Sequence, residues 1–201
     1  MRLSGAKRRQ MTDEQIHEHL FDERARIAAR GRVRQFVFGS LDGLLVPLGV
    51  VSGVAGGTGH IHAVVVAGLA EAFAGALSMG AGEYLSGKAE AQVQRYEIER
   101  EGHEIQRNPE VERREIAALF EREGIPPESA RQVARIIATS PEAWLKTMAE
   151  KELGLSVDAA DDQWIDSLYM GFSYLLASSV PLLPYFFLSL RLAFVVSLIA
   201  T

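Results

Sequence analysis

The sequence contains no cysteine, which excludes disulfide bonds, zinc–thiolate sites, iron–sulfur clusters and cysteine nucleophiles. It is also poor in positive charge. Twenty-one lysines and arginines against 26 acids leave a net charge of −5, which argues against a nucleic-acid partner. No nucleophile–base set, phosphate-binding loop or nucleotide fingerprint is found in the sequence, so we do not expect a conventional enzyme.

Charge is scarce in two long stretches of the 201-residue chain. Residues 36–84 contain three charged side chains, Asp42, Glu71 and Glu83, and residues 167–201 contain only Arg191. Residues 88–166 carry 18 acids and 11 bases. This distribution excludes a simple water-soluble globule. It predicts an all-α, multi-pass helical membrane protein with a charged cytoplasmic insert between transmembrane helices 2 and 3.

The apolar stretches divide into membrane segments. Residues 36–57 and 62–85 are each long enough to cross ~30 Å of hydrocarbon, and the short glycine-rich turn between them predicts an antiparallel hairpin. A third apolar segment covers residues 165–184, and a fourth begins at Tyr185 and stops after 17 residues, which is short for a crossing. Small residues four positions apart allow helix backbones to approach closely in lipid; they are Gly49, Gly53 and Gly57 in the first segment and Ala72, Ala76 and Gly80 in the second.

The polar parts of the chain are predicted to be helical as well. A capping-box spacing at Thr12 begins an amphipathic helix over residues 13–34, which we place on the membrane surface; a solvated helix against a soluble neighbour is the alternative. Nine lysines and arginines precede Phe36 and none lies in the loop 56–62, so the N-terminus and the insert are expected to be cytoplasmic. Helices in the insert are predicted over residues 88–107, 110–123, 127–139 and 141–153.

Four regions follow from these patterns. They are an N-terminal cytoplasmic helix in residues 1–35, transmembrane helices 1 and 2 in 36–87, a cytoplasmic helical domain in 88–163, and transmembrane helix 3 with an incomplete helix 4 in 164–201.

Two acids lie at membrane depth, where an ionisable group is costly and normally marks an ion pathway. Asp42 lies in the first crossing, five residues before Pro47, and Glu71 lies near the middle of the second. Met79 follows on the same helix. Carboxylates with a thioether suit a borderline transition-metal ion better than Mg²⁺ or Ca²⁺. The alternative is that both acids are protonated and join helices by hydrogen bonds.

The insert carries a second group of acids at helical spacing. Glu97, Glu101 and Glu104 share one helix face, and Glu112 and Glu115 share another after the Asn108-Pro109 turn. If that turn forms a hairpin, the two acidic faces meet, and facing carboxylates repel unless they share protons or bind a cation. Met148 and Glu152 lie four residues apart on the last helix. The alternative is a solvated face whose acids pair with the insert's arginines.

Several separated motifs together resemble the vacuolar iron transporter family. They are Asp42-Gly43-Leu44 with Pro47-Leu48, then Glu71 followed by Leu77-Ser78-Met79-Gly80 and Glu83-Tyr84-Leu85, the insert acids with Pro141, Trp144-Leu145, Met148 and Glu152-Leu153-Gly154-Leu155, and finally Pro181-Leu182-Leu183-Pro184-Tyr185. The resemblance extends from about residue 34 to residue 185.

The resemblance implies a homodimeric transporter in a lipid bilayer, which moves Fe²⁺ out of the cytosol in exchange for protons. Members have five crossings and a cytoplasmic helical domain between the second and third. By position, Asp42, Glu71 and Met79 would line the translocation path near the dimer axis. The iron-collecting site of the insert would consist of Glu101, Glu104, Glu112, Glu115, Met148 and Glu152.

The sequence departs from the family pattern at two places. Ala149 stands where members often have a second methionine, which leaves Mn²⁺ and Zn²⁺ open beside Fe²⁺. The fifth crossing is absent and the fourth is incomplete, so we expect either a fragment or a membrane-anchored iron buffer or sensor that does not transport. An alanine- and arginine-rich chain favours a bacterial cell membrane, with a vacuolar membrane as the eukaryotic alternative.

Overall fold

The computed structural model describes residues 13–157 and 163–201, with side chains described from Val33 onward. Residues 1–12 of the predicted N-terminal region and 158–162 of the predicted insert lie outside the described residues. The described residues form helices, turns and short irregular connections without a strand, which confirms the predicted all-α class. The chain divides into two compact units, Met1–Tyr84 with Gln163–Thr201 and Leu85–Asp162. We call them the membrane unit and the insert unit.

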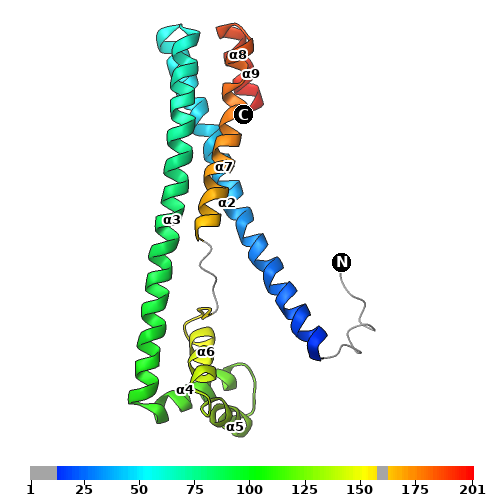
Figure 1. Cartoon of the computed structure of the whole chain (residues 1–201), viewed down its shortest axis with the longest axis vertical. Coiled ribbons are helices and arrows are strands. Elements are labelled where there is room, and N and C mark those ends of the chain that lie inside the picture. Colours follow the sequence, from blue (N-terminus) through cyan, green and yellow to red (C-terminus); the bar gives the residue numbers. More distant parts are fainter. Residues whose placement is uncertain (1–12, 158–162) are drawn as a thin grey trace. The chain divides into compact units, whose positions relative to one another are not determined.

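Two long helices provide most of the membrane unit (Figure 1). Helix α2 covers Asp13–Thr58 and α3 covers Ile61–Arg107. They run antiparallel from a tight turn in which Gly59 has a φ of +67°, a backbone conformation that side chains other than glycine's rarely adopt. Val33–Thr58 and α3 each contain a stretch long and apolar enough to cross a membrane. The membrane unit therefore contains the hairpin that the short glycine-rich loop predicts.

The helix boundaries differ from the prediction at two places. The helix predicted over residues 13–34 and the first apolar segment form one helix, α2, and the second apolar segment continues into the first insert helix as α3. At both places the sequence changes between charged and apolar residues without a proline, so the backbone hydrogen bonds continue. The location of residues 13–34 on a membrane surface stays a prediction.

The C-terminal part of the membrane unit consists of α7 (Gln163–Leu182), α8 (Pro184–Phe187) and α9 (Leu190–Ala200). The apolar run predicted as one segment from Tyr185 is therefore divided, because Leu188 and Ser189 are extended. Helix α9 has 11 residues. At a rise of about 1.5 Å per residue it is shorter than the ~30 Å hydrocarbon layer.

Close helix packing in the membrane unit depends on glycines other than the predicted stripe in α2. A Cβ at Gly43 would meet the backbone of Tyr174 and lie 3.0 Å from the Cβ of Ala177, and a Cβ at Gly75 would meet the Tyr174 ring. The second predicted stripe does take part, since Gly80 in α3 lies against Ser167. A Cβ at Gly49, Gly53 or Gly57 would meet no heavy atom of the described chain within 4 Å.

This difference predicts opposite results for one substitution at two places in α2. Gly43→Ala should lower the free energy of unfolding by on the order of 2 kcal/mol, because its Cβ has no room beside the α7 backbone. Gly49→Ala should leave stability unchanged or slightly raised, because its Cβ position is open and alanine favours a helix. Thermal unfolding of the purified chain in detergent measures both. Equal melting temperatures for the two variants would contradict the packing described here.

The insert unit contains the end of α3 and three short helices, α4 (Pro109–Arg122), α5 (Pro127–Ile137) and α6 (Pro141–Lys151). Each short helix begins with a proline, whose missing N–H costs nothing in the first turn. The Ser140 hydroxyl caps α6 by accepting a hydrogen bond of 3.3 Å from the Ala143 N–H. An apolar core joins the helices and includes Ile116, Ala117, Ala130, Ala134, Trp144 and Met148.

Candidate cation sites

Three glutamates of the insert unit converge from three different segments. Glu101 lies on α3, Glu112 on α4, and Glu152 directly after α6. One carboxylate oxygen from each lies within 4.8 Å of the other two. The turn at Asn108 changes the direction of the chain between α3 and α4, and Glu101 and Glu112 lie together on its two sides. A group of three oxygens at this separation can hold a metal ion.

The electrostatics of this group favour a bound proton or cation. Glu101 is 1% exposed and Glu112 5%, and each has a buried carboxylate oxygen without a hydrogen-bond partner among the described residues. Burial and then the carboxylates of Glu152, Glu104 and Glu115 raise the pKa of Glu101 from 4.5 to about 7. Burial followed by Glu115 and Glu101 raises the pKa of Glu112 to about 7 as well. Burial and neighbouring acids also raise the pKa of Glu152, which stays exposed to solvent.

The other three residues predicted for this site occupy different surroundings. Glu115 lies close enough to Glu112 to raise the pKa of that carboxyl, and Glu104 acts on Glu101 through its charge. These two acids therefore flank the converging group. Met148 is fully buried in the apolar core of the insert unit, one helical turn before Glu152. The structure thus brings three of the six predicted residues together, and the ligand roles of the other three stay predictions.

The arginines of the insert pair mainly with acids outside this group. Arg100 forms an ion pair of 3.0 Å with Glu97 and one of 3.8 Å with Glu104, and Arg113 pairs with Glu110 at 3.1 Å. The described ion pairs include neither Glu101 nor Glu112. This argues against the alternative in which the whole acidic surface is simply solvated and neutralised by arginine.

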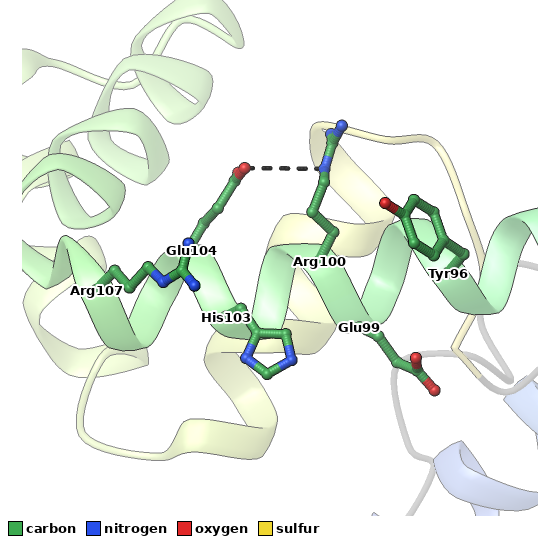
Figure 2. A pocket seen from close by; sticks show the side chains of 6 residues that line it. All are labelled: Tyr96, Glu99, Arg100, His103, Glu104 and Arg107. Atoms are coloured by element: carbon green, nitrogen blue, oxygen red, sulfur yellow. Dashed lines mark ion pairs between the residues drawn. The ribbon is translucent and has the colours of Figure 1, made fainter.

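A hollow of about 280 Å³ lies over α3 beside these ion pairs (Figure 2). Figure 2 shows Glu104 and Arg100 extending toward each other, whereas His103 and Glu99 point to the opposite side. Tyr96 and Arg107 complete its lining. None of the three converging glutamates lines this hollow, so it is a separate surface feature of α3.

Two of the three residues predicted for the ion pathway lie near the same tyrosine of the membrane unit. Asp42 on α2 and Glu71 on α3 are both half-buried. The Tyr174 hydroxyl of α7 donates a hydrogen bond to Glu71 Oε1, and Asp42 lies close enough to act electrostatically on the same hydroxyl. Met79 is half-buried eight residues after Glu71, which corresponds to about 12 Å along the helix. No hydrogen bond given for the described residues joins Met79 to either carboxylate.

Tyr174 is a residue that the sequence analysis did not single out. It lies in an apolar run, where a lone tyrosine carries no signal of its own, and its partner Glu71 is 103 positions away. Glu83 also has an unpredicted partner, because the Gln35 side-chain amide donates a hydrogen bond of 3.2 Å to its carboxylate. Both contacts join residues that are distant in sequence, so only the helix packing reveals them.

Comparison with known proteins matches both units to one family. The family model described as the VIT family matches residues 33–201. Vacuolar iron transporter 1 of Eucalyptus grandis is 38% identical over 170 residues, which are 84% of this chain and 68% of that protein. Vacuolar iron transporter 2 of Oryza sativa subsp. japonica is 35% identical over 181 residues, which are 90% of this chain and 71% of that protein. Protein CCC1 of Saccharomyces cerevisiae is 30% identical over 159 residues, which are 78% of this chain and 49% of that protein.

Proposed function

Because this chain belongs to the VIT family, we propose that it carries Fe²⁺ out of the cytosol across a membrane in exchange for protons. Two of the relatives named above are called vacuolar iron transporters, which supports iron as the transported ion. The observation that carries the proposal is a pair of separate carboxylate groups. Glu101, Glu112 and Glu152 converge in the insert unit, and Asp42 and Glu71 lie in the two helical stretches that are long and apolar enough to cross a membrane.

The proposed first step is capture of the ion by the insert. Glu152 is exposed and meets the ion first, while Glu101 and Glu112 supply buried oxygens that lack other partners. Because the pKa values of both buried acids are raised to about 7, they hold protons near neutral pH when no metal is bound. Binding of Fe²⁺ displaces those protons, so capture is coupled to proton release.

The proposed second step is passage through the membrane unit. Asp42, Glu71 and Met79 offer carboxylate oxygens and one thioether, a set that suits Fe²⁺ and also accepts Mn²⁺ or Zn²⁺. Each acid must lose its proton to bind the ion and regains one after release on the far side. Metal and proton fluxes then run in opposite directions.

We also propose that the transporter is a homodimer in the lipid bilayer of a cell membrane. The membrane unit exposes many large apolar side chains on α2, including Phe36, Leu41 and Leu45, which lipid or a second copy must cover. Support for the dimer comes from these exposed faces, and its test is the mass of the detergent-solubilised chain.

Anaerobic proteoliposomes test the transport proposal. Fe²⁺ entry is measured with a fluorescent chelator inside the vesicles, under a pH gradient and without one. We expect flux that rises with the gradient and declines when Mn²⁺ competes. An Fe²⁺ flux of equal size with and without the pH gradient would overturn proton exchange. Tight Fe²⁺ binding without flux would identify a membrane-anchored iron buffer instead.

A further inference from the structure

We propose that Tyr174 is a positioning residue for ion passage, which holds the Glu71 carboxylate so that one of its oxygens is directed to the ion. The inference rests on the proposed function and adds a residue from α7 to a pathway otherwise built from α2 and α3. Its basis is the hydrogen bond from the Tyr174 hydroxyl to Glu71 Oε1.

The two oxygens of Glu71 have different surroundings. Oε1 accepts the hydrogen bond from Tyr174, whereas Oε2 is buried and has no partner among the described residues. A buried carboxylate oxygen without a partner is costly, so it needs a proton, a water molecule or a cation. In a pathway for a divalent cation, Oε2 is the oxygen available to the ion.

Tyr174 is itself fixed by its packing against both α2 and α3. Tyr174 is 2% exposed, and its ring fills the space left by the missing side chain of Gly75, the residue one turn after Glu71. The Tyr174 backbone lies against Gly43 of α2, one residue after Asp42. The Ser178 hydroxyl donates a hydrogen bond of 2.7 Å to the Tyr174 carbonyl oxygen. A residue fixed in this way can orient a flexible glutamate without touching the ion.

The test compares Tyr174→Phe with a matched control. Tyr185 is also 2% exposed in the membrane unit, but its hydroxyl has no hydrogen-bond partner among the described residues. Tyr174→Phe should raise the KM for Fe²⁺ roughly tenfold, the typical weight of a hydrogen bond to a charged group, and leave the maximal rate within about twofold. Tyr185→Phe should change neither value. A defect in folding or insertion would instead lower the maximal rate without this rise in KM.

A second variant and a second measurement complete the test. Gly75→Ala should also raise KM, because its Cβ would displace the Tyr174 ring, while reaction with a surface label confirms insertion. Equilibrium Fe²⁺ binding is measured in the full chain carrying Glu101→Gln and Glu112→Gln, with and without Tyr174→Phe, where we expect affinity to be about tenfold weaker with phenylalanine. This measurement decides the role of Tyr174 even if the wild-type chain does not transport. An unchanged KM and affinity in Tyr174→Phe, an equal effect of Tyr185→Phe, or no binding with Tyr174 present would overturn the inference.

Discussion

Replacing Asp42 by asparagine should reduce Fe²⁺ flux into proteoliposomes to the level of empty vesicles, while the chain still inserts into the membrane. Asparagine has nearly the same shape but carries neither the negative charge that attracts the ion nor a proton to exchange. Asp42 lies in an apolar segment, where an unneeded charge would be costly. Removing the charge of Asp42 therefore should not impair membrane insertion. Glu71→Gln should have the same effect, because it removes the second carboxylate near the Tyr174 hydroxyl.

A matched substitution distinguishes loss of the pathway from a general loss of charge. Asp166 lies in the first turn of α7, and Asp166→Asn makes the same chemical change outside the proposed pathway. Flux in this variant should stay close to wild type. Normal transport by Asp42→Asn would show that the pathway is assigned to the wrong residues.

The second large effect is expected in the insert. The double variant Glu101→Gln, Glu112→Gln should weaken Fe²⁺ binding by at least about a hundredfold at pH 7.5, since loss of even a supporting contact to a metal ligand typically costs ten- to a hundredfold. These two side chains are the buried members of the converging group. Titration calorimetry of the full chain in detergent, under anaerobic conditions, measures the affinity. The membrane unit retains its own acids, so a weaker binding event should remain.

The pH dependence of wild-type binding follows from the same two acids. Their pKa values are raised to about 7, so below pH 7 protons occupy the oxygens that the ion needs. Affinity should be nearly constant above about pH 8 and should decline through pH 7 and below, by up to about tenfold per pH unit for each proton displaced. Ordinary carboxylates would place this decline near pH 4 to 5 instead.

A glutamate on α5 provides the control for both measurements. Glu128 is exposed and forms an ion pair of 2.8 Å with Arg131, whose hydrogen bond lowers the pKa of that carboxyl. Glu128→Gln removes one negative charge from the insert unit without touching the converging group. It should leave both the affinity and its pH dependence unchanged. A loss equal to that of the double variant would mean that the insert attracts iron by its overall charge rather than at a site.

Much of the local structure was accessible from short patterns in the chain. The prolines at residues 109, 127 and 141 each begin a short helix of the insert unit, close to where the sequence places it. The Asn108 turn likewise predicts that Glu101 and Glu112 meet, and one oxygen of each lies within 4.8 Å of the other. Helix starts and tight turns depend on neighbouring residues, which is why reasoning from the sequence succeeds there.

Other features required the packing of distant segments. Helical spacing predicts Glu104 and Glu101 equally as metal ligands. In the structure Glu104 pairs with Arg100, whereas Glu101 is buried beside Glu112 and Glu152. The glycine stripe from Gly49 to Gly57 has the spacing of a packing surface, yet Gly43 and Gly75 provide the close contacts within the chain. Helical periodicity identifies which residues share a face, but it does not identify what that face contacts.

The sequence by itself determined the helical class, the division between apolar segments and acidic insert, and the family to which the chain belongs. Scarcity of charge over long runs and turn residues at defined places are properties of consecutive residues, so they can be recognised without a structure. Only the tertiary structure decided which glutamates converge and that Tyr174 contacts Glu71 across 103 positions. Those contacts depend on how whole helices pack, and the energy that selects one packing is distributed over many side chains that no local pattern records.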